Sequence, residues 1–411
     1  SLSNGGTNIS WPVQFTGTAA AMNTWFDGLV FTPTAYSQSP NNFSDHPIFT
    51  LEIDDGVATT TKILNISFDN TSKNYLVTNT NDSGAGSLRK AVNAASSGDV
   101  ITFALSDYLS TIRLNSTIDL NKNLTIKGPG ANLLRISGDS NGDGNPDVKI
   151  FNVSRVVSID GVHFIDAKST AGGALSVSSD GELFVTGCEF TNCIAEEWGG
   201  AIDVFNGKLI ADSCLFYNNS VSASSGRGGG AVSIYSNKDA KFLNTTFSGN
   251  SQLASGAIGG GAVYIENYEP STQLKVNFNH CTFVANFDES SVANSICTNV
   301  FGTNVELSNN IFSDNSFPSL WVLGASEINT KGGNISKDTT RVDLTQTGNA
   351  NSYIILDNPT DKTSTDPLLD GLYSSRAATR YHALLVGSPA INAGVSTDDV
   401  NSVDQRGFIR E

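Results

Sequence analysis

Residues 228–251 read GGGAVSIYSNKDAKFLNTTFSGNS, and residues 259–287 read GGGAVYIENYEPSTQLKVNFNHCTFVANF. Both stretches open on three glycines and an alanine and continue through short segments in which apolar and polar residues alternate. Both also contain a phenylalanine with an asparagine three residues later. Alternation of this kind is typical of β-strands, and no helical period of apolar residues runs through either stretch. The two stretches therefore predict a repeated all-β unit.

The unit extends beyond these two copies. The alanine after the glycines recurs at spacings of 27, 30, 31 and 31 residues, the last copy being degenerate, at Ala174, Ala201, Ala231, Ala262 and Ala293. The second half of each copy contains a phenylalanine, at Phe190, Phe216, Phe247, Phe283 and Phe312. Repeats of 20–50 residues indicate a solenoid or a propeller, and a propeller blade usually needs four strands in about 40–45 residues. Because these units are shorter, we predict an all-β fold, a right-handed parallel β-helix in which each copy is one coil.

Stacking of coils about 4.8 Å apart explains why these residue types recur. The phenylalanines are predicted to form an internal aromatic column. Asn219, Asn250, Asn286 and Asn315 follow them by three residues, with Cys193 in the first copy, and are predicted to bond turn backbone groups and one another. The glycines are expected where the chain needs a positive φ or passes close to the next coil.

Three of the five cysteines share one position of the repeat. Cys188, Cys214 and Cys281 each precede the phenylalanine by two residues, and Thr245 completes the column. Cysteines on neighbouring coils can bridge geometrically, but stacked buried thiols also serve as small apolar residues. Both interpretations stay open. No C-x-x-C and no His/Cys cluster is present, which makes zinc an unfavoured ligand.

The repeats divide the chain into three parts. The β-helix is predicted over residues 76–345, its C-terminal end and a capping region over 346–411, and a separate N-terminal β segment or arm over 1–75. A solenoid needs caps over its open ends. Leu88, Ala91, Val92 and Ala95 have the i, i+3, i+4, i+7 spacing of a short helix with one apolar face, which we predict to cover the first coil.

Composition and charge limit the partners. The 411 residues include 40 acidic and 24 basic side chains, for a net charge of −16. This charge disfavours nucleic acid and anionic membrane surfaces as partners. No apolar run approaches the roughly 20 residues that a membrane-spanning helix needs. The chain begins SLSNGG without Met, and N-x-S/T triplets occur at eleven asparagines, Asn8 and Asn244 among them. We therefore expect an exported protein, extracellular or at the cell surface.

Several motifs resemble known families. The opening VTNTNDSGAGSLRKAVNAASSGDVITF, residues 77–103, resembles the start of bacterial surface β-helix proteins, and the GGAI and F-x-x-N motifs resemble the repeats of polymorphic outer-membrane proteins. The ending, RYHALLVGSPAINAG at 380–394 and VDQRGFIR at 403–410, is similar to the C-terminal signature of choice-of-anchor Q proteins. The resemblance covers roughly residues 76–315 and 365–411. It implies a secreted β-helix displayed at a cell surface and leaves the activity undefined.

One loop has the pattern of a calcium site. In GDSNGDGNPDV, oxygen-bearing side chains occupy alternate positions and a glycine stands sixth, as in the first nine positions of an EF-hand loop. The predicted calcium ligands are Asp139, Asn141, Asp143, Asn145 and Asp147. The twelfth position is Ile150, where an EF-hand has a bidentate glutamate. The alternative is a plain turn, because Asp, Asn and Gly favour turns.

Catalytic residues are not evident. A polysaccharide lyase or hydrolase on a β-helix needs paired carboxylates, or carboxylates beside Lys or Arg. The acidic candidates share no repeat position, and we expect Asp203 and Glu189 to face solvent. These candidates are Asp166, Glu189, Glu196, Glu197, Asp203 and Asp212. Arg227 and Trp198 precede glycine motifs and could line a sugar groove, although loop residues of this kind usually have no binding role.

Three functional classes remain. We favour a non-catalytic extracellular or cell-surface structural or adhesive protein. It could form fibres by head-to-tail contacts with copies of itself through residues 1–75, and the end at Glu411 without an anchor fits retention by such contacts. The second class is a β-helix that binds or degrades surface glycans, and the third is the passenger of a larger secretion system. A groove with clustered carboxylates and aromatic residues would favour the second class, and flat polar faces would favour the first.

Overall fold

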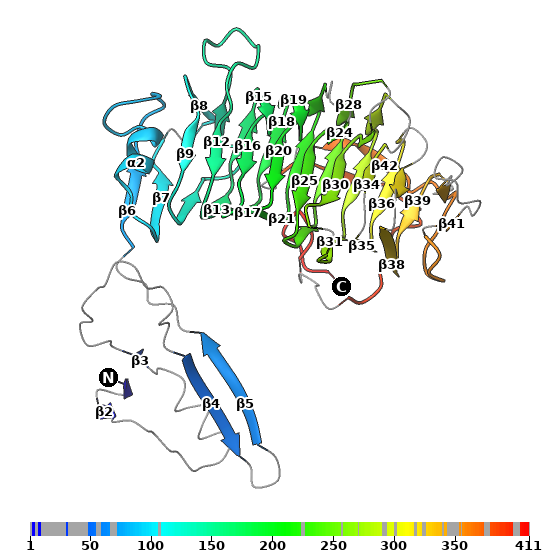
Figure 1. Ribbon diagram of the computed structural model, residues 1–411, viewed down its shortest axis with the longest axis horizontal. Coiled ribbons are helices and arrows are strands. Elements are labelled where there is room, and N and C mark those ends of the chain that lie inside the picture. Colours follow the sequence, from blue (N-terminus) through cyan, green and yellow to red (C-terminus); the bar gives the residue numbers. More distant parts are fainter. Residues whose placement is uncertain are drawn as a thin grey trace. The chain divides into compact units, whose positions relative to one another are not determined.

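The computed structural model divides the chain into two compact units, Ser1–Asp69 and Asn70–Glu411 (Figure 1). The structure describes residues 72–410, with gaps at 106–107, 223–226, 256–257, 270, 290–293, 300–301, 316–318, 323–325, 339–340, 343–352, 355, 374–378 and 398–402. Before residue 72 it describes only the backbone of five strands.

Those five strands form two antiparallel sheets. One has the order β2-β1-β3, and the other is the hairpin β4-β5, in which Ile48 pairs with Asn65. Their bounds are β1 (Leu2–Asn4), β2 (Thr7–Ile9), β3 (Val30–Phe31), β4 (Ile48–Asp54) and β5 (Thr59–Asn65).

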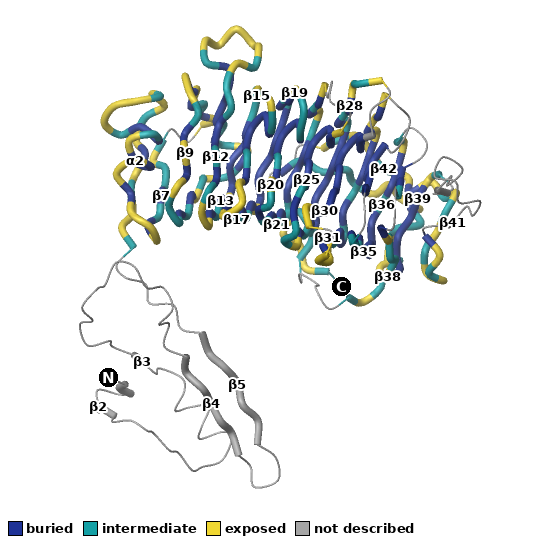
Figure 2. The backbone as a smooth tube through the Cα atoms, in the orientation of Figure 1, coloured by how far each residue is buried: buried dark blue, intermediate teal, exposed yellow. Residues whose placement is uncertain are grey.

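The second unit is a parallel β-helix, as the repeats predict. Each full coil passes through a first, a second, a fourth and then a third sheet, and each strand pairs in parallel with its equivalent in the next coil. Figure 2 shows that these strands are largely buried, whereas longer loops such as residues 141–145 are exposed. In the part of the chain that the structure describes, the one helix is α2 (Leu88–Ala94).

The first sheet contains β6 (Asn74–Val77), β7 (Asp99–Phe103), β10 (Leu124–Lys127), β13 (Val156–Asp160), β17 (Glu182–Thr186), β21 (Lys208–Asp212), β26 (Ala240–Leu243), β31 (Leu274–Asn279), β35 (Thr303–Ser308) and β38 (Glu327–Gly332). The second sheet contains β8 (Ser110–Arg113), β11 (Leu134–Ser137), β14 (His163–Ile165), β18 (Glu189–Thr191), β22 (Leu215–Tyr217), β27 (Thr246–Ser248), β32 (Thr282–Val284), β36 (Ile311–Ser313) and β39 (Ile335–Ser336).

The third sheet contains β9 (Ile118–Leu120), β12 (Phe151–Val153), β16 (Leu175–Val177), β20 (Ile202–Phe205), β25 (Val232–Ser236), β30 (Val263–Asn267), β34 (Ile296–Asn299) and β37 (Leu320–Val322). The fourth sheet contains β15 (Lys168–Ala171), β19 (Ile194–Trp198), β23 (Ser220–Val221), β28 (Ser251–Gln252) and β33 (Phe287–Asp288). The remaining strands form three pairs: β24 (Arg227–Gly229) with β29 (Ile258–Gly260), β40 (Arg341–Val342) with β41 (Tyr353–Ile354), and β42 (Leu369–Tyr373) with β43 (Tyr381–Leu384).

The predicted phenylalanine column lies in the core. Its rings stack nearly parallel, with centroids 4.8 Å apart for Phe190–Phe216 and 5.0 Å apart for Phe283–Phe312. Phe164 extends the column by one coil, at 4.9 Å from Phe190. Because the spacing equals the strand spacing of a sheet, each ring fills its own layer and excludes water from the next.

The predicted asparagine column is also confirmed. Asn250 Nδ2 donates to the Phe216 carbonyl at 3.0 Å and to Asn286 Oδ1 at 2.9 Å, and Asn286 Oδ1 accepts the Asn250 backbone N–H at 3.1 Å. The residue before each buried Asn or Cys has a positive φ, which turns the chain inward, at Asn192, Asn218, Gly249, Ala285 and Asp314.

The glycines allow the coils to approach closely. A Cβ on Gly200 would lie 2.0 Å from the Gly230 carbonyl oxygen, and a Cβ on Gly230 would lie 2.0 Å from that of Gly261. Only glycine fits this column, as the repeat predicts. The five cysteines are buried free thiols: Cys188, Cys214, Cys281, Cys193 and Cys297.

Helix α2 packs at the N-terminal end of the β-helix. Its Leu88, Ala91 and Val92 are buried, as predicted, and the Ser87 hydroxyl accepts the Lys90 N–H as the N-cap. Lys122 Nζ donates to the carbonyls of Val92, Asn93 and Ala95 at the other end of the helix. A cation at these carbonyls is favourable because they carry the negative end of the helix dipole.

Candidate functional site

The predicted calcium loop projects between β11 and β12, with an exposed tip (Figure 2). Asp139 is buried at its base, where Oδ1 accepts the N–H of Gly142 at 2.7 Å and Oδ2 accepts that of Gly144 at 3.1 Å. Asp147 Oδ2 accepts the Ser140 hydroxyl at 2.6 Å. Backbone donors thus occupy the carboxylate that would be the first calcium ligand.

The other members of the loop lie at its tip. Asp143 Oδ1 accepts the N–H of Asn145 at 2.8 Å, and Asp143 N–H donates to Asn141 Oδ1 at 2.8 Å. Hydrogen bonds from Asn145 hold the pKa of Asp143 below its usual value. Across the described residues, no group of three or more His, Cys, Asp or Glu side chains converges as a metal site would require. The calcium site stays a prediction.

The acidic candidates of the sequence are distributed over separate elements. Asp166 and Asp212 lie at corners and accept the side-chain amides of Asn192 and Asn244 on the neighbouring coil. Glu189 does not face solvent as expected: it is buried on β18 and forms an ion pair with Arg380, whose Nη2 is 2.8 Å from Glu189 Oε2. The expectation fails because Arg380, 191 residues away in sequence, lies over this strand and binds the carboxylate.

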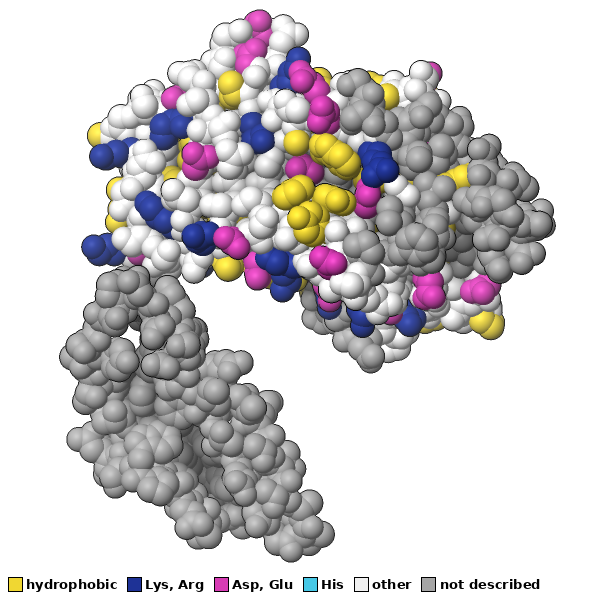
Figure 3. Space-filling model, viewed as in Figure 1, with side chains coloured by type: hydrophobic (Ala, Val, Ile, Leu, Met, Phe, Trp, Pro, Cys, Tyr) yellow, Lys and Arg dark blue, Asp and Glu magenta, His cyan; other side chains and the backbone are white. Residues whose placement is uncertain are grey.

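A cluster of aromatic side chains lies on the outer face of the third sheet. We name it the aromatic platform, and its members are Trp198, Phe205, Tyr235, Tyr264 and Tyr268. Figure 3 shows hydrophobic side chains gathered over this part of the β-helix, with a basic and an acidic side chain beside them. Of these five residues, only Trp198 is marked in the sequence by its place before a glycine motif.

The rings of the platform pack against one another; Tyr264 is fully buried beneath the cluster, and the other four rings are partly or largely exposed. Phe205 lies 5.7 Å from both Tyr235 and Tyr268, and Trp198 stacks on Tyr235 at 6.3 Å. Phe205 and Tyr268 are 47% and 41% exposed, which is high for rings of this size. The platform is therefore a preformed apolar surface built by three successive coils, the first of which supplies Trp198 from β19 and Phe205 from β20.

A charged network borders the platform. Arg227 Nη1 donates to Glu266 Oε1 at 2.9 Å, and the Tyr264 hydroxyl donates to Glu266 Oε2 at 2.6 Å. Asn299 Nδ2 donates to the Tyr264 hydroxyl at 3.0 Å. Glu266 is buried while the Arg227 side chain is 45% exposed, so the guanidinium presents its remaining donors at the surface. Sequence reasoning placed Arg227 beside a glycine motif, and the structure brings it to the same surface as Trp198.

Polar residues continue along the third sheet from the platform toward α2. The register aligns Asp119, Asn152, Ser176 and Asp203 on successive strands. Lys149 Nζ donates to Ser176 Oγ at 2.7 Å. Burial raises the pKa of Asp203 to about 7, although the positive charge of Lys149 acts to lower that pKa. This column adds hydroxyl, amide and carboxyl groups to the surface that the aromatic rings begin.

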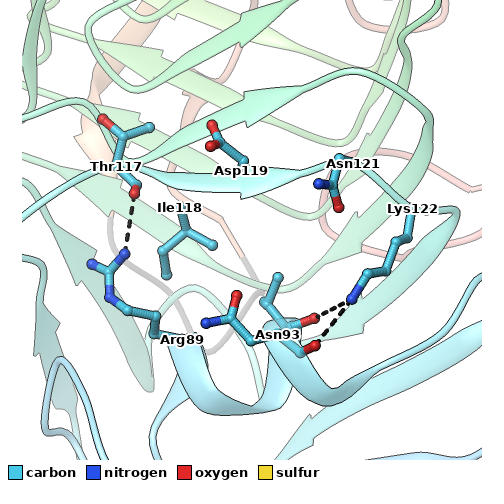
Figure 4. Close-up of a pocket in the computed structure, with 8 residues that line it drawn as sticks. Arg89, Asn93, Thr117, Ile118, Asp119, Asn121 and Lys122 are labelled. Atoms are coloured by element: carbon cyan, nitrogen blue, oxygen red, sulfur yellow. Dashed lines mark hydrogen bonds between the residues drawn. The ribbon is translucent and has the colours of Figure 1, made fainter.

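A separate pocket lies between α2 and β9. Figure 4 shows Arg89 and Lys122 at its two sides. Arg89 donates to the carbonyls of Thr117 and Ser116 and pairs with Asp82 at 2.6 Å, and Lys122 binds the carbonyls of α2. Because these contacts use the cations to attach the helix to the first coils, the pocket belongs to the cap.

The fold defines the chain as a parallel β-helix protein. A scan against models of protein families gives no match, and a search of curated proteins gives no relative. The resemblance of the repeats to polymorphic outer-membrane proteins, and of the ending to choice-of-anchor Q proteins, is therefore an interpretation of the motifs. Among the described helical segments, none has the length and apolar character needed to cross a membrane.

Proposed function

We propose that this protein is a non-catalytic extracellular β-helix that binds uncharged glycans at the aromatic platform. The observation that carries the proposal is the combination of exposed rings with the Arg227–Glu266–Tyr264 network on one sheet face. Large exposed apolar patches rimmed by polar groups mark interaction sites. Pyranose rings have an apolar face of C–H groups and a rim of hydroxyls, and such a ligand matches rings bordered by donors and acceptors.

Charge favours a neutral ligand over a uronate. The chain carries a net charge of −16, which repels polyanions. Glu266 already pairs with Arg227, and Asp203 lies two residues before Phe205 on β20. The platform thus offers Arg227 as a hydrogen-bond donor whose charge is compensated.

Binding without cleavage is the simpler role for this surface. Glycoside hydrolysis needs two carboxyl groups at the scissile bond. Here the Glu266 carboxylate accepts hydrogen bonds from Arg227 and Tyr264. The other carboxyl group, Asp203, is on β20, two coils away from β30. We therefore assign no acid–base pair, and the rod would present the platform as an adhesive surface.

The test is calorimetric titration with neutral oligosaccharides of different linkage, together with polygalacturonate as the anionic comparison. We expect saturable binding of at least one neutral chain and none of the polyanion. Phe205→Ala and Tyr235→Ala should each weaken binding about tenfold, which corresponds to 1.4 kcal/mol. Tyr108→Ala is the matched control, because Tyr108 is 82% exposed and lies outside the platform. Equal losses in all three variants, or no binding of any neutral chain, would refute the proposal.

A further inference from the structure

The last part of the chain returns along the side of the β-helix. Residues in the ranges 379–397 and 403–410 contact the second sheet and the corner that precedes it, and we name these two ranges the C-terminal clasp. Arg380 binds Glu189 on β18, and Gln405 binds both the Cys214 carbonyl and Thr246 on β27. These contacts join residues as much as 191 positions apart.

Further along the β-helix the clasp makes paired hydrogen bonds. Asn309 Nδ2 donates to the Val395 carbonyl at 3.0 Å, and Val395 N–H donates to Asn309 Oδ1 at 2.7 Å. Asn279 Nδ2 donates to Thr397 Oγ1 at 3.0 Å. The clasp therefore spans several coils and is held mainly by polar groups rather than by an apolar core.

Three of the four histidines of the chain lie at this interface. His163 Nε2 is 2.8 Å from Thr191 Oγ1, which also accepts Arg380 Nη2 at 3.2 Å. His382 belongs to the clasp, and its Nε2 is 3.0 Å from Ser248 Oγ. His280 lies beside Gly394 of the clasp: a Cβ built on Gly394 would be in ordinary van der Waals contact with His280 Nε2, at 3.9 Å.

Charged groups of neighbouring elements surround these rings. His163 is flanked by Arg135 of β11 and Arg380 of the clasp, with Glu189 Oε2 at 4.0 Å. His280 faces Arg410 of the clasp, and Arg410 in turn faces Asp212 and Asp404.

The surroundings of His382 are different. Its Nδ1 is 2.8 Å from the Asp370 carbonyl oxygen, and the Asp314 carboxylate is nearby, itself paired with Lys337. Two of the three histidines therefore lie beside arginines, and a second positive charge there would be repelled.

We propose that the clasp is an acid-sensitive latch: it is docked at neutral pH and leaves the second sheet when His163, His280 and His382 become protonated. Release would uncover the outer face of β18, β22 and β27 while the coils stay intact. The proposal is independent of glycan binding, because the platform lies on the third sheet.

The direction follows from proton linkage. Burial, with Arg135 and Arg380, lowers the pKa of His163 to about 3, and burial with Arg410 lowers the pKa of His280 to about 4. Burial also lowers the pKa of His382. A released histidine regains a pKa near 6.5, so the released state binds more protons. Docking is therefore unaffected above about pH 6.5 and weakens progressively as the pH falls toward 4.

Hydrogen–deuterium exchange of the full chain at pH 7.5 and pH 4.5, corrected for intrinsic exchange rates, tests the proposal. We expect protection of peptides from 379–397 and 403–410 to fall at least about tenfold at pH 4.5. Peptides from β17, β21 and β26 should keep their protection. Loss in the clasp and in these strands together would mean global unfolding and would overturn the proposal, as would equal protection of the clasp at both pH values.

Variants separate histidine from other acid effects. The triple variant His163→Gln, His280→Asn, His382→Gln should keep the clasp protected at pH 4.5; asparagine is chosen at 280 because φ there is +56°. His46→Gln is the matched control and should behave like the parent. Glu189→Gln should weaken docking at pH 7.5 and retain the pH dependence. If the triple variant retains the full pH dependence, or fails to fold while each of the three single variants retains it in full, histidine is not the trigger.

Discussion

Asn250 donates its side-chain amide to Asn286 Oδ1 at 2.9 Å and accepts both the backbone N–H and the side-chain amide of Asn219 on the preceding coil. One buried side chain thus joins three coils. Each asparagine of the column satisfies a backbone N–H that the turn leaves without a β partner. The column is therefore a structural requirement of every coil, because a buried unpaired N–H is costly.

Replacing Asn250 with Ala should destabilise the β-helix strongly. It would leave the Asn219 N–H buried without a partner, at about 1–3 kcal/mol, and would also remove the side-chain amide bond to the Phe216 carbonyl. Urea denaturation measures the loss. Asn152→Ala is the control, since Asn152 Nδ2 makes a similar bond between coils to Asp119 on the exposed face. A control that loses as much as Asn250→Ala would contradict the role of burial.

Phe247 is the central ring of the internal column. It stacks at 4.9 Å on both Phe216 and Phe283 and is fully buried. Phe247→Ala should lower the free energy of unfolding by about 3–5 kcal/mol through the cavity it creates. Phe205→Ala on the outer face should cost much less, because that ring is 47% exposed. Equal denaturation midpoints for the two variants would contradict the stacked core.

The coil architecture could be predicted because its determinants recur locally. Phenylalanine, asparagine and glycine each occupy one position in most of the repeated coils, so their spacing along the chain already encodes the stacking. A second ladder of side-chain amides could not be predicted, because its residues do not recur along the chain. Asn310 Nδ2 donates to Asn334 Oδ1 at 3.0 Å, and Asn334 Nδ2 donates to Asp361 Oδ1 at 2.9 Å. Asn310 and Asn334 occupy the repeat position that cysteine has in earlier coils, but they do so only in the last coils, where the repeat has degenerated.

The candidate surfaces could not be predicted in the same way. Phe205 and Tyr235 share a repeat position, four residues after Ala201 and Ala231, and pair in the register of the third sheet. In the next coil that position is Glu266, and Tyr268, two residues further on, completes the cluster without any repeat signal. Alternation does show which residues face outward, and an excess of aromatic residues at outward positions is the signal that was available. The Arg380–Glu189 pair leaves no local pattern, because its partners are 191 residues apart.

Asp203 should make stability depend on pH. Burial raises the pKa of Asp203 to about 7 from an ordinary value of 3.8, so the folded chain binds its proton more tightly than the unfolded chain. The stabilising contribution of the protonated carboxyl is complete below about pH 4 and is lost as the pH rises through 7. Asp203→Asn should therefore raise stability at pH 8, on the order of 2 kcal/mol, and have little effect at pH 4. Asp180→Asn, at an exposed carboxyl, is the control. A pH-independent effect of Asp203→Asn in urea denaturation would rule out this titration.

Calcium is the ligand that the sequence pattern of residues 139–147 predicts. The Asp139 carboxylate accepts backbone N–H groups at the base of the loop, and the remaining oxygens of Asn141, Asp143 and Asp147 are at its exposed part. Millimolar Ca²⁺ should raise the melting temperature, as expected for a weak extracellular site, and Asp143→Ala should abolish the rise. Mg²⁺ at the same concentration and the variant Asp180→Ala are the controls. If Ca²⁺ and Mg²⁺ act alike, or Ca²⁺ has no effect, the loop is a turn closed by its own hydrogen bonds.

Self-association through the N-terminal segment is the remaining prediction. Residues 1–69 form a compact unit of their own, and the alternating Trp11, Val13 and Phe15 lie outside the described residues. A parallel β-helix grows by strand addition, and β6 is the terminal strand of its first sheet. An extended segment added to such an edge joins chains head to tail, and head-to-tail contacts that do not close into a ring give filaments. We expect the intact chain to assemble at high concentration and a variant lacking residues 1–30 to stay monomeric, as measured by light scattering and electron microscopy. The alternative is that the segment folds back on its own chain. A strictly monomeric intact protein, or assembly that the deletion leaves unchanged, would exclude strand donation.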